Sequence, residues 1–118
     1  MSYRIRITES RSERSVFFKL ESGDFCDGNW RESTRTNHCT IHVSRTLGNP
    51  PIWMVDTSSF PDSPSFIDYG HTFDEATKKA YGHAKERANF TANRYGWIVE
   101  DLTSFRENES DLIAQTSA

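Results

Sequence analysis

The sequence predicts an α+β protein built as a two-layer sandwich, in which a mostly antiparallel sheet of about five strands carries one long helix on one face. Three observations lead to this fold class. Several short runs alternate apolar and polar residues, which is typical of half-buried strands. A single long stretch repeats apolar residues at the spacing of a helix. The chain has 118 residues, which is enough for one hydrophobic core and too few for two.

The strands are predicted from alternation, because successive side chains of a strand point to opposite faces of the sheet. In residues 3–8, the side chains of Tyr3, Ile5 and Ile7 face one side, whereas those of Arg4, Arg6 and Thr8 face the other. The other predicted strands are residues 16–21, 39–44, 52–56 and 97–102. The helix lies between the last two, so the predicted order of elements is β-β-β-β-α-β. The first two strands are expected to pair as a hairpin.

The helix is predicted to run from Phe73 to Tyr95. Thr72 and Glu75 form a capping box, in which each side chain accepts a hydrogen bond from the other's backbone N–H. Gly96 is suited to the left-handed conformation that ends a helix. One face of the helix is rich in alanine, which lets its backbone approach the sheet closely; this face comprises Phe73, Ala76, Thr77, Ala80, Tyr81, Ala84, Ala88, Thr91, Ala92 and Tyr95.

Two polar stretches are predicted to be long loops that nevertheless keep aromatic side chains. Residues 24–38 include Trp30, which either folds back into the core or stays available to a partner. Residues 57–71 contain two prolines and three aromatic residues, which is typical of an ordered surface loop. We assign residues 1–105 to a single domain. Residues 106–118 have little apolar content to bury, so we expect a frayed tail there.

The composition excludes several classes of protein. The chain has 14 Lys and Arg residues and 17 Asp and Glu residues, for a net charge of -3, whereas general nucleic-acid binders usually carry a strongly basic surface. It contains no apolar run long enough to cross a bilayer, so we expect no membrane partner. The first residues lack the apolar region of a secretory signal. We therefore expect a cytoplasmic location.

The sequence shows no local signature of catalysis, so we expect neither enzyme activity nor a cofactor. It lacks a nucleophile elbow, a phosphate-binding loop, a dinucleotide-binding fingerprint and a zinc-protease motif. Cys26, His38, Cys39 and His42 are residue types that bind zinc, but strand alternation points Cys39 inward and both histidines outward. We predict no metal site and two reduced thiols. A small enzyme that uses His38 or His42 remains an alternative.

The sheet face opposite the helix is one candidate binding surface. It is predicted to expose Arg4, Arg6, Phe17 and Lys19, together with His42. A basic face with an outward aromatic ring is suited to stacking on single-stranded nucleic acid. This surface supports an alternative prediction, in which the protein is a nucleic-acid-binding or regulatory module.

The margin of the helix is a second candidate surface. His83, Arg87, Phe90 and Arg94 follow one another at helical spacing beside the alanine face. An aromatic ring flanked by arginines resembles the hot spots of protein–protein interfaces. Trp30, a large aromatic residue in a polar stretch, is a third candidate contact.

These observations predict a small non-enzymatic binding protein that docks onto a larger partner, either a protein or a protein–nucleic-acid complex. Small stand-alone domains are frequent among accessory proteins of bacteriophages and mobile elements, including inhibitors of host defence such as anti-CRISPR proteins. That role is our specific prediction. A homodimer is a further expectation, because an open sheet has unpaired edges and an uncovered face.

Overall fold

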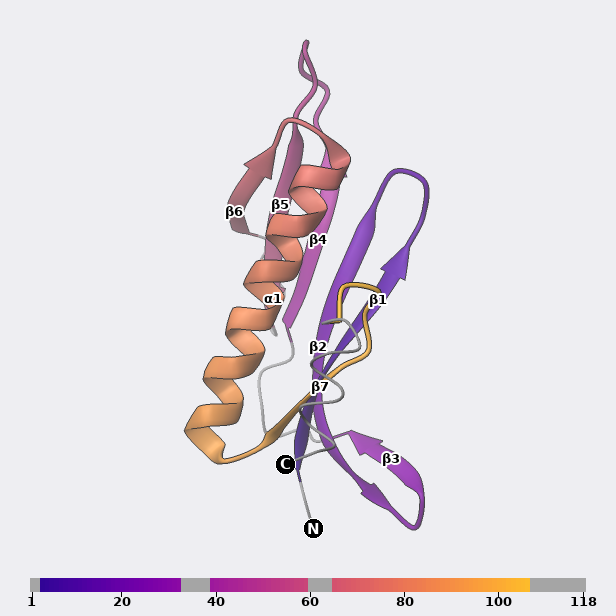
Figure 1. Ribbon diagram of the computed structural model, residues 1–118. Coiled ribbons are helices and arrows are strands. Elements are labelled where there is room, and N and C mark those ends of the chain that lie inside the picture. The colour runs from indigo at the N-terminus through magenta and orange to yellow at the C-terminus, as the bar shows by residue number, and fades with distance from the viewer. Residues whose placement is uncertain (1–2, 33–38, 60–64, 107–118) are drawn as a thin grey trace.

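A computed structural model describes residues 3–32, 39–59 and 65–106 and shows the predicted α+β architecture (Figure 1). Within these ranges, a sheet forms one layer and one helix forms the other. The described elements, in chain order, are β1 (Arg4–Arg11), β2 (Val16–Cys26), β3 (Asn29–Glu32), β4 (Cys39–Arg45), β5 (Trp53–Ser59), β6 (Ser65–Gly70), α1 (Phe73–Tyr95) and β7 (Ile98–Asp101).

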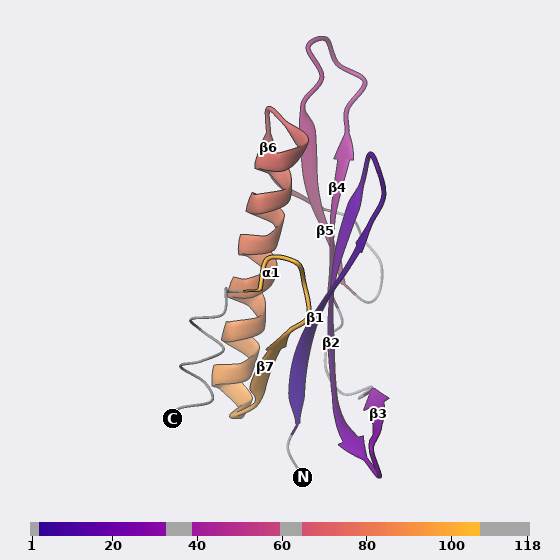
Figure 2. The ribbon, with the colours of Figure 1, turned by 45° about the vertical axis from the view of Figure 1, so that its right-hand side comes forward.

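The sheet is antiparallel except at one edge. Its strand order is β6-β5-β4-β2-β1-β7, and β3 pairs with the far end of β2. Only β7 runs parallel to its neighbour, β1, among the described strands. Because α1 follows the edge strand β6 and precedes the edge strand β7, it runs obliquely over one face of the sheet and contacts β6, β5, β4, β2, β1 and β7 (Figure 1). Figure 2 shows α1 on one side of the sheet, and it shows the end of β2 and β3 curling away from α1.

The first predicted loop is wrong in its first half. In place of a loop beginning at residue 24, β2 continues to Cys26 and turns back into β3. Together with β6, this strand raises the described sheet from about five strands to seven. Asp27 and Gly28 form the turn with φ of 54° and 80°, and a two-residue hairpin turn of type I′ has such positive values at both positions. Residues 33–38 of that prediction lie outside the described residues.

The second predicted loop is also wrong. β5 extends to Ser59, and Ser65–Gly70 forms the edge strand β6. The pairing of β5 with β6 shifts between Val55 and Asp56, so β6 carries a bulge that disturbs simple alternation. Residues 60–64 lie outside the described residues. The prediction of a frayed tail also falls outside them, apart from Arg106.

The helix has the predicted ends. The Thr72 hydroxyl accepts a hydrogen bond from the Glu75 backbone N–H at 3.0 Å. The Glu75 carboxylate reaches one residue further than a capping box requires and accepts from the His71 N–H at 3.1 Å. Gly96 ends the helix with φ of 71°, in the left-handed region.

The core lies between the alanine face of α1 and the inward face of the sheet. Ala76, Ala80, Ala84 and Ala88 are fully buried, so the helix backbone lies close to the strands as predicted. Of the strand residues that alternation assigned to this face, Tyr3 is exposed, because it precedes β1 and stacks on Trp97. The others are buried: Ile5, Ile7, Val16, Phe18, Leu20, Cys39, Ile41 and Val43. On the opposite face of the sheet the described residues place no second helix, and only β3 turns toward that face at one end (Figure 2).

Candidate functional site

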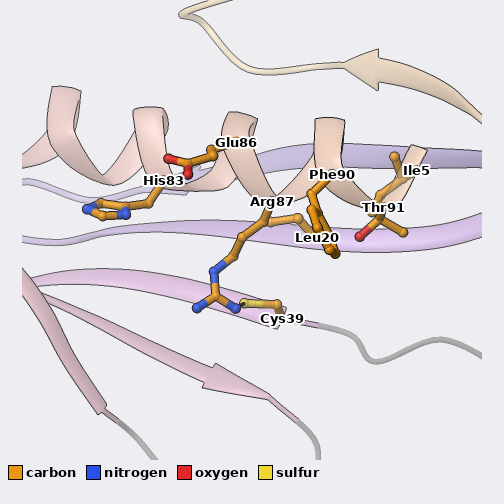
Figure 3. A pocket seen from close by; sticks show the side chains of 8 residues that line it. All are labelled: Ile5, Leu20, Cys39, His83, Glu86, Arg87, Phe90 and Thr91. Atoms are coloured by element: carbon orange, nitrogen blue, oxygen red, sulfur yellow. Dashed lines mark hydrogen bonds between the residues drawn. The ribbon is translucent and has the colours of Figure 1, made fainter. Parts of the chain in front are cut away.

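A cavity of about 580 Å³ opens between α1 and the sheet, and we call it the helix groove. Three strands supply its floor through Ile5, Leu20 and Cys39, each of which is nearly fully buried. The helix supplies its wall, and Figure 3 shows these side chains: His83, Glu86, Arg87, Phe90 and Thr91. The groove thus combines an apolar floor with a polar, partly exposed wall.

The helix wall is a direct result of helical spacing. Arg87 follows His83 by four residues and Phe90 follows Arg87 by three, so the three side chains share one stripe of α1. This stripe runs beside Ala84 and Ala88, which are pressed against the sheet. Side chains next to a buried stripe lie at the boundary between helix and sheet, and there they border the groove. Phe90 remains 67% exposed at its rim.

Arg87 spans the groove from the helix to the sheet (Figure 3). Its Nη1 donates to the Cys39 Sγ at 3.5 Å, and that sulfur lies 3.1 Å from the Thr57 hydroxyl. A thiol is a weak hydrogen-bond acceptor and leaves the guanidinium charge uncompensated. No carboxylate of the described residues forms an ion pair with Arg87. The groove therefore presents a cation with donors available to a ligand.

His83 closes the other end of the groove and is held by the edge strand β6. Its Nε2 lies 3.0 Å from the Asp68 Oδ2, and because a carboxylate only accepts, Nε2 must donate. The hydrogen bond from His83 lowers the pKa of Asp68, with further lowering from the Tyr69 backbone N–H and the charge of Lys79. Asp68 therefore fixes the imidazole at the groove wall.

We expect Asp68→Asn to lower the free energy of unfolding at neutral pH by about 0.2–1 kcal/mol, as for an exposed ion pair. The pKa of Asp68 is lower in the folded than in the unfolded state, so its contribution is complete above the unfolded value of about 3.9 and disappears as the pH falls through the folded value. Urea midpoints of the wild-type and D68N proteins should therefore converge in acid. A difference that is constant with pH would contradict this assignment.

The structure brings together three of the four residues predicted at the helix margin. His83, Arg87 and Phe90 line the groove, whereas Arg94 does not and instead lies over the Tyr95 ring at 5.7 Å. The sequence pattern did not indicate that the buried strand residues Ile5, Leu20 and Cys39 belong to the same site. No sequence signal pairs Cys39 with Arg87, which is 48 positions away.

The outer face of the sheet carries the predicted cations, but carboxylates compensate them. Arg4 Nη1 lies 2.5 Å and Arg6 Nε 2.9 Å from the two oxygens of Glu100. Lys19 Nζ lies 3.2 Å from Glu21. The parallel pairing of β7 with β1 places Glu100 opposite Arg6. Three cations of this face therefore share two carboxylates, and none of the three is left without a partner.

The aromatic residues of the outer face contact other side chains of the chain. Trp30 packs on the outer face, with the Arg6 guanidinium 3.9 Å from its ring centroid, so it neither enters the core nor extends freely into solvent. A Cβ at Gly23 would lie 2.9 Å from the Trp30 ring, so the glycine makes room for it. Phe17 stacks on His42 at 4.0 Å with nearly parallel rings.

The other predicted chemistry concerns cysteine and histidine. Among the described residues, no three His, Cys, Asp or Glu side chains gather as metal ligands would. Cys26 and Cys39 are both free thiols. His42 lies on the outer face, where burial lowers its pKa and the charge of Asp56 opposes that effect. It does not line the helix groove, and His38 lies outside the described residues.

No protein-family model, curated protein or solved structure matches this chain. In the ranges that the structure describes, no helix has both the length and the apolar character needed to cross a membrane.

Proposed function

We propose that this protein is a non-enzymatic binding protein that docks through the helix groove onto a larger macromolecular partner in the cytoplasm. The exposure of Phe90 carries this proposal, because a large aromatic side chain is 67% accessible at the rim of a cavity with a buried apolar floor. Arg87 lies beside it without a carboxylate partner among the described residues. Exposed aromatic and arginine side chains around an apolar pocket are typical of interface hot spots. The free Cys26 and Cys39 suit a reducing compartment.

A protein surface is the partner class that these observations favour. Nucleic-acid binding needs several cations that are available to phosphates. On the outer face Arg4, Arg6 and Lys19 each have a carboxylate within ion-pairing distance. Binding that is insensitive to salt would support this choice, and binding that weakens steeply with salt would favour the nucleic-acid alternative.

The sequence also predicts a homodimer that forms through the sheet. The edge strand β6 has features that disfavour such pairing. β6 carries a bulge opposite Val55 and Asp56, and Asp68 points toward the helix side from this strand. Bulges and inward charges are features that discourage edge-to-edge pairing of strands. Sedimentation equilibrium distinguishes a monomer from the predicted homodimer.

Phe90→Ala is expected to weaken partner binding by about 30-fold or more, because truncation of a hot-spot residue costs about 2 kcal/mol or more. The experiment compares capture from a host lysate by the wild-type, F90A and F17A proteins, with partners identified by mass spectrometry. Phe17 is a matched control, because it is an exposed phenylalanine on the opposite side of the sheet.

The result is read from which variant loses the partner. A partner that F90A loses and F17A retains supports docking through the groove. Loss with F17A alone would move the contact to the outer face of the sheet. If the wild-type protein captures no macromolecule reproducibly, the proposed function is wrong.

The specific role that we propose is inhibition of a host defence complex, as anti-CRISPR proteins perform it. A single small domain with an exposed aromatic contact site supports this role. In cells with active CRISPR interference, the wild-type protein should raise the plating efficiency of a targeted phage. F90A should not raise it, and an unchanged plating efficiency with the wild-type protein would exclude this role while leaving docking to be judged by capture.

A further inference from the structure

The helix groove has two chemically different ends, and Figure 3 shows their order along α1. Ile5, Leu20 and Phe90 form an apolar end, where two buried strand residues face an exposed ring. His83 and Glu86 lie at the polar end. A ligand that spans the groove therefore meets apolar surface at one end and charged or polar groups at the other.

Arg87 lies between the two ends. One of its nitrogen atoms is held by the Cys39 thiol, and its charge is not neutralised by any described carboxylate. An arginine in this situation binds a carboxylate well, because its planar donors match the two oxygens. Glu86 disfavours a second negative charge at the polar end. The charges thus place an incoming carboxylate at Arg87, directly beside the apolar end.

The exposure of the wall indicates the size of the partner. Glu86, Arg87 and Phe90 are all exposed, so the groove is open along the helix side. Pockets for small molecules usually bury roughly 70–90% of the ligand surface. A groove that is open along one side leaves more of a small ligand in contact with solvent. A macromolecular surface closes the open side itself. Among the described residues that line the groove, Arg87 is the one arginine or lysine, whereas nucleic acid requires several phosphate contacts.

We infer that the helix groove recognises a peptide segment in which an aliphatic side chain stands next to an Asp or Glu side chain. The aliphatic group fills the apolar end formed by Ile5, Leu20 and Phe90, and the carboxylate pairs with Arg87. This inference rests on the proposed function and names the chemistry of the partner surface.

Short blocked peptides test the inference without knowledge of the partner. The probes are acetyl-Gly-Leu-Glu-Gly-amide, the same peptide with Gln in place of Glu, and the same peptide with Gly in place of Leu. Each is titrated into the ¹⁵N-labelled full chain and followed by NMR. We expect millimolar-range binding of the Leu-Glu peptide, with shifts at Leu20, Arg87 and Phe90. We expect affinity about tenfold weaker without the carboxylate, and a similar loss without the leucine side chain.

Variants of two arginines distinguish recognition from general electrostatics. Arg87→Gln should reduce the preference for Glu over Gln to about one, whereas Arg94→Gln should leave the tenfold preference intact. Arg94 is a suitable control because it lies on the same helix and does not line the groove. Phe90→Ala should weaken the Glu and Gln peptides equally. The labelled spectra also report whether each variant is folded.

Three results would overturn the inference: no shifts in the groove at millimolar peptide, equal affinity of the wild-type protein for the Glu and Gln peptides, or a preference that persists in R87Q. Failure of the inference is distinct from failure of the proposed function. If F90A abolishes capture of a partner while the peptides show no carboxylate preference, docking through the groove is supported and recognition of a carboxylate is wrong. If neither partner nor peptide binds the wild-type protein, both fall.

Discussion

Replacing Phe18 by alanine is expected to remove much of the stability of this protein. Phe18 lies on β2 and has the largest fully buried side chain among the described residues. Its ring centroid lies 6.1 Å from that of Tyr81 on α1 and 6.0 Å from that of Phe105 after β7. Removing such a ring leaves a cavity and costs about 3–5 kcal/mol, out of about 5–15 kcal/mol for a typical domain. Urea denaturation followed by circular dichroism measures the loss.

Phe17→Ala is the matched control, because it removes the same ring one position away on the opposite face of the sheet. Phe17 is 40% exposed, and its ring stacks on His42 at 4.0 Å. We expect a loss of about 0.5–1.5 kcal/mol, the range for an aromatic pair. Equal losses for F17A and F18A would show that the outer face is covered as tightly as the core, and the two-layer assignment would be wrong.

The layer assignment was predictable from the sequence because it depends on local rules. In β1, β2 and β4, every second side chain points toward the helix, and this alternation does not depend on which strand lies alongside. The ends of α1 follow from Thr72 and Gly96, which act on backbone groups only a few residues away. Strand faces and helix ends could therefore be assigned before the tertiary structure was known.

The two strands that were missed are short, and tertiary pairing stabilises them. β3 has four residues and depends on a turn at Asp27 and Gly28, a dipeptide that is a known hairpin signal. β6 mixes Asp68 with aromatic residues and bulges against β5, so its alternation is broken. The residues that precede β6 in the sequence are rich in proline and serine, a composition typical of loops. Strand pairing outweighs local composition in both cases.

The candidate site was predictable only on the helix. Spacing along α1 identified His83, Arg87 and Phe90 as one stripe. It could not identify the floor, because Cys39 and Arg87 meet only through the packing of α1 on the sheet. The same limit explains the outer face, where Arg4 pairs with Glu100 across 96 positions of sequence. Contacts between distant segments decide which predicted cations remain available to a partner.

The junction of β6 with α1 gives the second large expected effect. Gly70→Ala should destabilise the protein by about 1–3 kcal/mol, because the new methyl group has no room. A Cβ at Gly70 would lie 2.6 Å from the backbone nitrogen and 2.9 Å from the Cα of Ala76, in the first turn of the helix. Backbone atoms cannot rotate away as a flexible side chain does, so α1 would have to shift from the edge strand.

Gly82→Ala makes the same chemical change with the opposite expected sign. Gly82 lies inside α1 on an exposed position, and a Cβ there would meet nothing within 4 Å. Alanine is favoured over glycine within a helix by about 0.8–1 kcal/mol, so G82A should raise the urea midpoint. Because both variants add one methyl group, the difference between them isolates the close approach of β6 to α1. If G70A unfolds at the wild-type midpoint, the helix does not start against β6, and the wall of the groove would have to be placed anew.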